Sequence, residues 1–249
     1  MTTFSANLGF LWAGRPLPDA IRAAKAAGFV AVECHWPYDT PAPEVKAALV
    51  ETGLPMLGLN TVRGNVDAGE NGLAALPGRE DEARAAIDQA VTYARAIGAK
   101  AVHVMAGFAQ GPAAEASFVA NLTYACSRAP DLTILIEPLN RHDAPGYFLA
   151  NTETACAIIE RVGASNLKLM FDCYHVGRTE GDLLTRLKNL GDLIGHIQFA
   201  SVPDRGAPDH GEINYPWLFA QIDKLGWGMP LGAEYKPGQA TEDTLHWLR

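Results

Sequence analysis

Short apolar runs alternate with segments of helical period along almost the whole chain. Eight of these runs are rich in branched and aromatic residues and are expected to form strands: 4–10, 29–36, 54–61, 99–107, 132–140, 167–175, 194–201 and 229–237. The runs are nearly continuous in apolar residues, which is typical of parallel strands covered on both faces. Between them lie Ala- and Leu-rich segments such as 18–28 and 78–99, each with a glycine near its end that is suited to terminate a helix.

Eight strand–helix units in 249 residues predict an α/β fold, a single (β/α)8 TIM barrel that spans residues 1–249 as one domain. The structural alternative is an open doubly wound sheet, which normally has fewer strands and a glycine-rich first turn. The segment NLGFLWAG in the first run does not supply that G-x-G-x-x-G pattern. The longest connection, 62–78, follows the third strand and has the length of a lid or binding loop.

Composition and charge favour an enzyme that acts on small molecules. Apolar residues make up 48% of the chain, enough for one large core, and the net charge is −8. An acidic chain is unsuited to binding the phosphate backbone of a nucleic acid irrespective of its sequence, so no nucleic-acid partner is expected. No apolar run reaches the roughly 18 residues of a membrane span, and the four cysteines match no metal or redox spacing. We therefore expect a cytoplasmic protein without a membrane partner.

Polar side chains end the last four predicted strands, where barrel enzymes place their chemistry. They are Glu137 in LIEP, Asp172 in LMFDCYH, Gln198 in GHIQFAS and Glu234 in LGAEYKP. Consecutive members are about 26 to 36 residues apart, roughly one strand–helix unit, so they should converge on one side of the barrel mouth. Three carboxylates and one amide offer only oxygen ligands, which favour a hard divalent cation, Mg²⁺ or Mn²⁺.

Each of these residues also has a purely structural interpretation. A single acid at a strand end is more often a helix cap or a surface ion pair, and only the joint occurrence on four consecutive strands favours a metal site. His103 and His196, inside apolar runs, are expected to be core histidines with satisfied hydrogen bonds.

Four further residues are candidates for binding a substrate: His175, Lys236, Arg205 and Glu70. His175 stands just beyond its strand and should lean over the barrel mouth. Lys236 should face the same way as the glutamate two residues before it, because side chains two apart share a face. Arg205 lies in a loop after the seventh strand, and Glu70 lies in the long loop, where it could equally serve a lid or simply be solvated.

Two glutamates on opposite sides of a bound small molecule suit proton transfer between neighbouring carbons. Glu137 and Glu234, on the fifth and eighth strands, form the expected pair: one removes a proton and the other manages its return. A metal would polarise a carbonyl and the adjacent hydroxyl and would hold the enediolate that forms. The residues alone leave open which glutamate is the acid and which is the base.

The chain resembles the hydroxypyruvate isomerase family, within the xylose isomerase-like TIM barrels. The resemblance runs through nearly the whole chain and rests on FSANLGF, GFVAVECHWPYD, AGENG followed by PGRE, YARAIGA, LIEPLN, FDCYH, GHIQFA, GEINY and EYKP. It implies a divalent metal held by Glu137, Asp172, Gln198 and Glu234, with the two glutamates as proton donor and acceptor. The implied reaction converts hydroxypyruvate into 2-hydroxy-3-oxopropanoate, which is tartronate semialdehyde.

Other activities stay open at this point. The same superfamily includes 2-oxo-tetronate isomerases, whose substrate has one more carbon, and ketose 3-epimerases, which usually have histidine in place of Gln198. An endonuclease of the apurinic type would need more histidines for zinc and a basic groove. A non-catalytic sugar-binding barrel would not need two opposed bases. Homo-oligomers are common among such barrels, so a homo-oligomer is a possible assembly.

Overall fold

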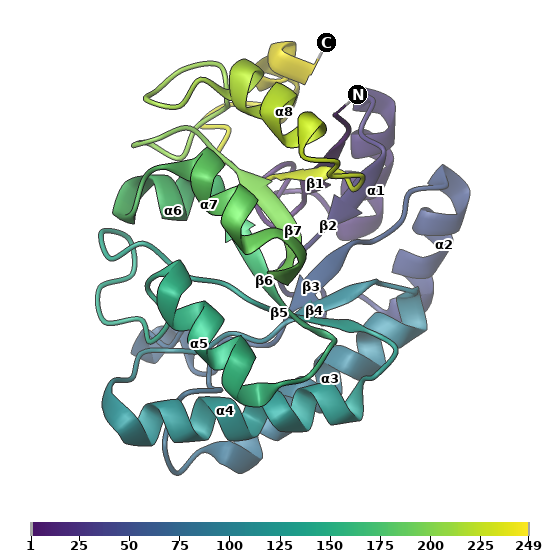
Figure 1. Ribbon diagram of the computed structural model, residues 1–249. Coiled ribbons are helices and arrows are strands. Elements are labelled where there is room, and N and C mark those ends of the chain that lie inside the picture. Colours follow the sequence, from purple (N-terminus) through teal and green to yellow (C-terminus); the bar gives the residue numbers. More distant parts are fainter. Residues whose placement is uncertain (1, 249) are drawn as a thin grey trace.

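The computed structural model describes residues 2–248 and shows parallel strands surrounded by helices (Figure 1). Within these residues the eight strands are β1 Phe4–Asn7, β2 Ala31–Glu33, β3 Gly58–Asn60, β4 Ala101–His103, β5 Thr133–Ile136, β6 Leu167–Asp172, β7 Ile194–Phe199 and β8 Leu231–Ala233. Each strand lies inside one of the eight predicted runs and is shorter than that run. The remaining residues of each run do not pair with a neighbouring strand and belong to the connections, many of them at the barrel mouth.

The strands form a nearly closed ring. Neighbours pair in parallel in the order β2-β1-β8-β7-β6-β5-β4-β3. β2 and β3 meet through a single parallel bridge between Val32 and Met56, with further backbone hydrogen bonds such as Cys34 N to Gly58 O at 3.1 Å. The predicted (β/α)8 TIM barrel is confirmed, and the open doubly wound alternative is wrong.

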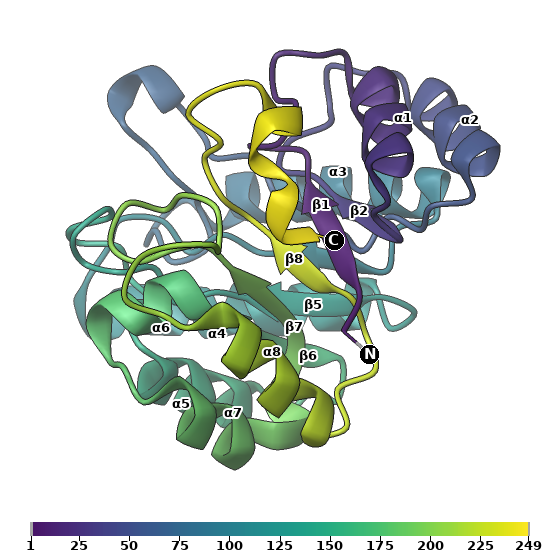
Figure 2. The ribbon, with the colours of Figure 1, turned by 90° about the horizontal axis from the view of Figure 1, so that it is seen from above.

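Helices cover the outside of the strands (Figure 2). They are α1 Leu17–Ala27, α2 Ala42–Thr52, α3 Glu80–Ile97, α4 Gly111–Arg128, α5 Thr152–Val162, α6 Cys173–Thr179, α7 Leu183–Leu190 and α8 Tyr215–Lys224. The helices predicted over 18–28 and 78–99 are confirmed as α1 and α3, and both end at left-handed glycines, Gly28 (φ 102°) and Gly98 (φ 80°). Between residues 2 and 248, no helix combines the length and apolar character that crossing a membrane requires.

The inner faces of the strands carry the polar residues to the barrel mouth. Ala101, Leu135 and Met170 form a small apolar cluster, separate from the main core. Because side chains two apart on a strand share a face, Glu137 and Asp172 stand above Leu135 and Met170 on that inner side. Apolar packing inside the barrel therefore fixes the level at which the carboxylates emerge.

Candidate active site

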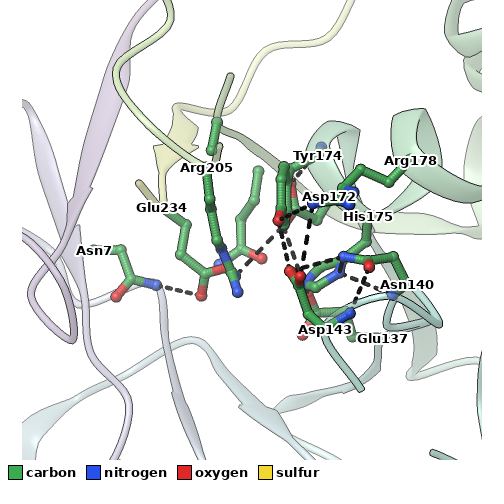
Figure 3. A network of polar contacts seen from close by, with 12 residues as sticks. Asn7, Glu137, Asn140, Asp143, Asp172, Tyr174, His175, Arg178, Arg205 and Glu234 are labelled. Atoms are coloured by element: carbon green, nitrogen blue, oxygen red, sulfur yellow. Dashed lines mark hydrogen bonds and ion pairs between the residues drawn. The ribbon is translucent and has the colours of Figure 1, made fainter. Parts of the chain in front are cut away.

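The structure brings the three predicted carboxylates together at the barrel mouth (Figure 3). Ligand atoms of Glu137, Asp172, His175 and Glu234 all lie within 4.8 Å of one another, and all four side chains are buried. Gln198, also buried, stands in register with Asp172 on the neighbouring strand. The expectation that residues spaced about one unit apart converge in space is met for this group.

Local structure explains why the first two carboxylates end their strands. β5 stops at Ile136, and Pro138 has no N–H with which to continue the ladder. At the end of β6 the chain turns into α6, and Asp172 caps that helix by accepting from Tyr174 N at 2.9 Å through Oδ1. The cap interpretation is therefore correct for one oxygen of Asp172, while its Oδ2 remains on the side of His175 and Arg205.

Glu234 is held through both of its carboxylate oxygens. Asn7 Nδ2 donates to Oε1 at 3.0 Å, and His35 Nε2 lies 2.9 Å from the same oxygen. Arg205 donates to Oε2 from the opposite side. These three contacts come from β1, the connection after β2 and the connection after β7, so this carboxylate is fixed by segments far apart in sequence.

Arg205 reaches from its loop between two of the carboxylates (Figure 3). Besides its pair with Glu234, the guanidinium lies 3.8 Å from Asp172 Oδ2. It also stacks over the rings of Phe10 and Tyr174, with Cζ 4.8 and 5.0 Å from the ring centroids. The predicted substrate-binding arginine is thus a buried cation at the centre of the site.

Electrostatics distinguish the three carboxylates. Burial, together with Glu234 and Asp172, holds the pKa of Glu137 well above its usual range, and burial with Glu234 nearby raises the pKa of Asp172 to about 7. For Glu234, burial acts in the same direction, but adjacent Arg205 and the hydrogen bond from His35 outweigh it and hold its pKa well below the usual range. The positive charge of Arg205 therefore compensates the negative charge of Glu234. The two other carboxylates, Glu137 and Asp172, are left for a divalent cation to compensate.

His175 turns one ring nitrogen toward this cluster without a hydrogen-bond partner among residues 2–248. Its Nδ1 accepts from Asn140 N at 2.9 Å, so the neutral ring carries its proton on Nε2. Burial lowers the pKa of His175 to about 3, which keeps the ring neutral. The protonated Nε2 lies 3.8 Å from Glu137 Oε1 and 3.7 Å from Asp172 Oδ2. A nitrogen that carries a proton does not bind a metal, so His175 points to a role other than ligand.

Buried oxygens without donors indicate where a cation fits. Among residues 2–248, Glu137 Oε1, Asp172 Oδ2 and Gln198 Oε1 have no hydrogen-bond partner although they are buried. Burying a polar oxygen costs free energy unless a hydrogen-bond donor or a cation binds it. All three belong to the predicted set of oxygen ligands, and oxygen ligands suit hard divalent cations. The residues present fit a metal ion.

A cavity of about 180 Å³ lies over the cluster. Its lining includes Glu137, His175, Arg205 and Glu234, with the aromatic side chains of Phe10 and Trp36. Pockets for drug-sized ligands measure roughly 300–1,000 Å³. The smaller space suits a substrate of a few carbons.

Two of the predicted substrate-binding residues are placed elsewhere in the described part of the chain. β8 ends at Ala233, so strand alternation does not extend to Lys236, whose side chain is exposed. Glu70 accepts from Asn65 N at 2.6 Å and pairs with Arg79, which ties the long loop to the start of α3. Neither Lys236 nor Glu70 is among the described residues that line the cavity.

Some residues of the site were missed or misjudged from the sequence. Asn7, His35 and Glu33 were not predicted, although a glutamate within the apolar run 29–36 was a signal for Glu33. His196 is a satisfied core histidine as expected, with Nε2 2.9 Å from Glu33 Oε2. The same expectation is wrong for His103: among residues 2–248 neither ring nitrogen has a hydrogen-bond partner, because the ring faces the cavity and Glu137, 3.7 Å away.

Comparison with known proteins gives matches over most or all of the chain. Residues 21–249 match the family described as xylose isomerase-like TIM barrel. The chain is 44% identical to 2-oxo-tetronate isomerase of Cupriavidus necator and 39% identical to hydroxypyruvate isomerase of Escherichia coli, in each case over 100% of this chain and 98% of the relative. A crystal structure from Brucella melitensis described as AP endonuclease, family 2, has a TM-score of 0.95 at 38% identity and covers 100% of this chain and 98% of its own. The curated relatives are isomerases, which identifies this chain as an enzyme of that class.

Proposed function

The chain belongs to the xylose isomerase-like TIM barrel family, and from that premise we propose that it isomerises a small hydroxy-keto acid, with hydroxypyruvate and 2-hydroxy-3-oxopropanoate as the first candidate pair. The observation that carries the proposal is the cluster of Glu137, Asp172 and Glu234 against a cavity of about 180 Å³. Such a cluster supplies two proton carriers and an acidic site for a cation within one small space.

Glu137, Asp172, Gln198 and Glu234 would hold Mg²⁺ or Mn²⁺, which, when bound, polarises the carbonyl and hydroxyl oxygens of the substrate and acidifies the intervening C–H. Glu137 and Glu234 extend from the ends of β5 and β8 and carry the proton between the two carbons. Removal from one carbon and return to its neighbour, together with passage of the hydroxyl proton to the oxygen of the former ketone, converts a hydroxy-ketone into a hydroxy-aldehyde through an enediolate. Glu234 is fixed by three donors, while Glu137 Oε1 has no hydrogen-bond partner within residues 2–248 and can exchange a proton.

Arg205 and His175 supply the donors that a negatively charged substrate needs. Arg205 brings a buried positive charge to the cavity, which suits a carboxylate or a developing oxyanion. His175 offers its Nε2–H beside Glu137 and Asp172, where a substrate oxygen can accept it. Phe10 and Trp36 cover part of the cavity with aromatic surface and limit the entry of water.

A second candidate substrate is a 2-oxo-tetronate, which has one more carbon. The observation that favours it is the 44% identity to an isomerase of that name, against 39% for hydroxypyruvate isomerase.

We further propose that nucleic acid is not a substrate. The net charge of −8 and a cavity of about 180 Å³ support this, because a nucleic-acid groove needs an extended basic surface.

The experiment is a comparison of turnover on hydroxypyruvate, on a 2-oxo-tetronate and on a ketose, each with Mg²⁺ or Mn²⁺ supplied. We expect kcat/KM on one of the two acids to exceed that on the ketose by at least about 100-fold, because only the acids pair their carboxylate with buried Arg205. Turnover of the ketose alone would overturn the proposed substrate class. The ratio between the two acids decides between the two candidates.

A further inference from the structure

Glu33 is a fourth buried carboxylate in the barrel, beside the candidate active site. It ends β2 and is 4% exposed. Ser5 Oγ donates to its Oε1 at 3.1 Å, and its Oε2 receives Gln198 Nε2 at 3.0 Å and lies 2.9 Å from His196 Nε2. Contacts on both oxygens fix the orientation of this carboxylate within the barrel.

Gly232 leaves the space that this arrangement occupies. A Cβ at Gly232 would lie 2.2 Å from Glu33 Oε1, 2.8 Å from Gln198 Cγ and 2.9 Å from His196 Nε2. In the order of the ring, β1 and β8 lie between β2 and β7. The absence of a side chain on β8 therefore lets Glu33 reach across the interior to β7.

Glu33 determines which end of the Gln198 amide is turned toward it. An ionised carboxylate only accepts hydrogen bonds, so the amide nitrogen must face Glu33 and the amide oxygen must face away. That oxygen has no hydrogen-bond partner in the described part of the chain, and Gln198 stands in register with Asp172. Without this anchor, the amide could turn its NH₂ toward a cation, where it cannot serve as a ligand.

We propose that Glu33 is a positioning residue that fixes the Gln198 amide with its oxygen available to the metal-binding carboxylates. This inference rests on the proposed function, because it assumes that Gln198 is a metal ligand. Groups that orient a metal ligand typically contribute about 10- to 100-fold to metal affinity. Glu33 acts through Gln198 and touches neither substrate nor reacting atoms.

Mn²⁺ binding, measured by electron paramagnetic resonance on the full chain, tests the proposal without relying on turnover. Glu33→Met removes the acceptor and should weaken Mn²⁺ binding by about 10- to 100-fold. Glu33→Gln should recover most of the affinity, because its amide oxygen can still accept from Gln198 while its nitrogen meets the Ser5 hydroxyl. If Glu33→Gln lost as much Mn²⁺ affinity as Glu33→Met, the negative charge of Glu33 would matter and not the oxygen that accepts from Gln198. That result would overturn the proposal.

A double-mutant cycle with Gln198→Ala tests whether Glu33 acts through this amide. In the Gln198→Ala background, Glu33→Met should weaken Mn²⁺ binding by less than about threefold, and a full additional loss would overturn the proposal. If Glu33→Met does not fold by circular dichroism, the exchanged pair Glu33→Gln with Gln198→Glu replaces it. That pair restores a donor opposite a carboxylate and should bind Mn²⁺ at least about tenfold more tightly than Gln198→Glu alone, and equal binding would contradict the inference.

Two controls separate this inference from the proposed function. Glu180→Gln changes another largely buried carboxylate, bonded to Thr152 and Arg186, and should leave Mn²⁺ binding unchanged. Failure of the unmodified protein to bind Mn²⁺ would refute the metal site and the positioning role together. Binding by the unmodified protein with no loss in Glu33→Met would refute only the positioning role.

Discussion

His35 provides a quantitative test of how Glu234 is held. His35→Phe keeps an aromatic ring against Phe10, whose centroid lies 5.1 Å away, and removes the Nε2 contact of 2.9 Å to Glu234 Oε1. A hydrogen bond to a charged group contributes roughly 1.5–3 kcal/mol. Asn7 still donates to the same oxygen at 3.0 Å and Arg205 to the other, so we expect the lower end of that range. About 1.5 kcal/mol corresponds to a decrease in kcat/KM of about tenfold.

The assay measures kcat/KM on the preferred acid substrate with a saturating divalent metal, together with thermal unfolding of each variant. His246→Phe is the matched control, because His246 is 65% exposed in its side chain and pairs with Asp209. We expect the control to stay within about twofold of the unmodified protein. A His35→Phe variant that folds and also stays within twofold would refute the inference that this contact holds Glu234 in its working position.

Three further predictions follow from the carboxylate cluster and its rim. Glu137→Gln or Glu234→Gln should lower kcat by at least about 100-fold while circular dichroism keeps the barrel signal, and near-normal kcat would contradict the proton-carrier role. With a chelator present, the melting temperature should fall as pH rises from about 6.5 to about 7.5, and Mg²⁺ or Mn²⁺ should reduce that fall. The raised pKa values of Glu137 and of Asp172, the latter about 7, keep protons on the folded protein that the unfolded chain has lost, so stability falls as these protons leave. Below about 6.5 the buried histidines His103 and His175, with pKa values lowered to about 3, act in the opposite direction, and the lowered pKa of Glu234 adds stability only in the acid range. A flat or rising melting temperature would contradict it. Gly72→Ala should destabilise the protein by about 1–3 kcal/mol in chemical unfolding, since Gly72 has a φ of 118° and a Cβ would lie 2.6 Å from Met105 O; unchanged stability would show that the loop yields freely.

The sequence was sufficient for residues that end strands, because their position depends on a repeating pattern. Glu137, Asp172, Gln198 and Glu234 each lie within one residue of the end of a strand, and barrel geometry places the ends of successive strands side by side in space. Lys236 shows the limit of that reasoning: its predicted direction assumed a strand that in fact ends at Ala233. Strand length depends on tertiary hydrogen bonds, which the local pattern does not contain.

Contacts that join distant strands could not be predicted from one sequence. Asn7 and His35 meet Glu234 across sequence separations of 227 and 199 residues, and no local pattern marks either as its partner. Glu33 reaches Gln198 only because Gly232 lacks a side chain. These residues reach the site only because the barrel closes, so their part in it can be recognised from the three-dimensional structure but not from the sequence.

Proton exchange during isomerisation tests the central claim most directly. The protein would be incubated with hydroxypyruvate and Mg²⁺ or Mn²⁺ in D₂O, and the products followed by proton NMR. We expect 2-hydroxy-3-oxopropanoate to form with solvent deuterium at carbon, and both formation and exchange to be lost in Glu137→Gln. Absence of deuterium incorporation with metal supplied, from hydroxypyruvate and equally from a 2-oxo-tetronate, would contradict proton transfer by Glu137 and Glu234.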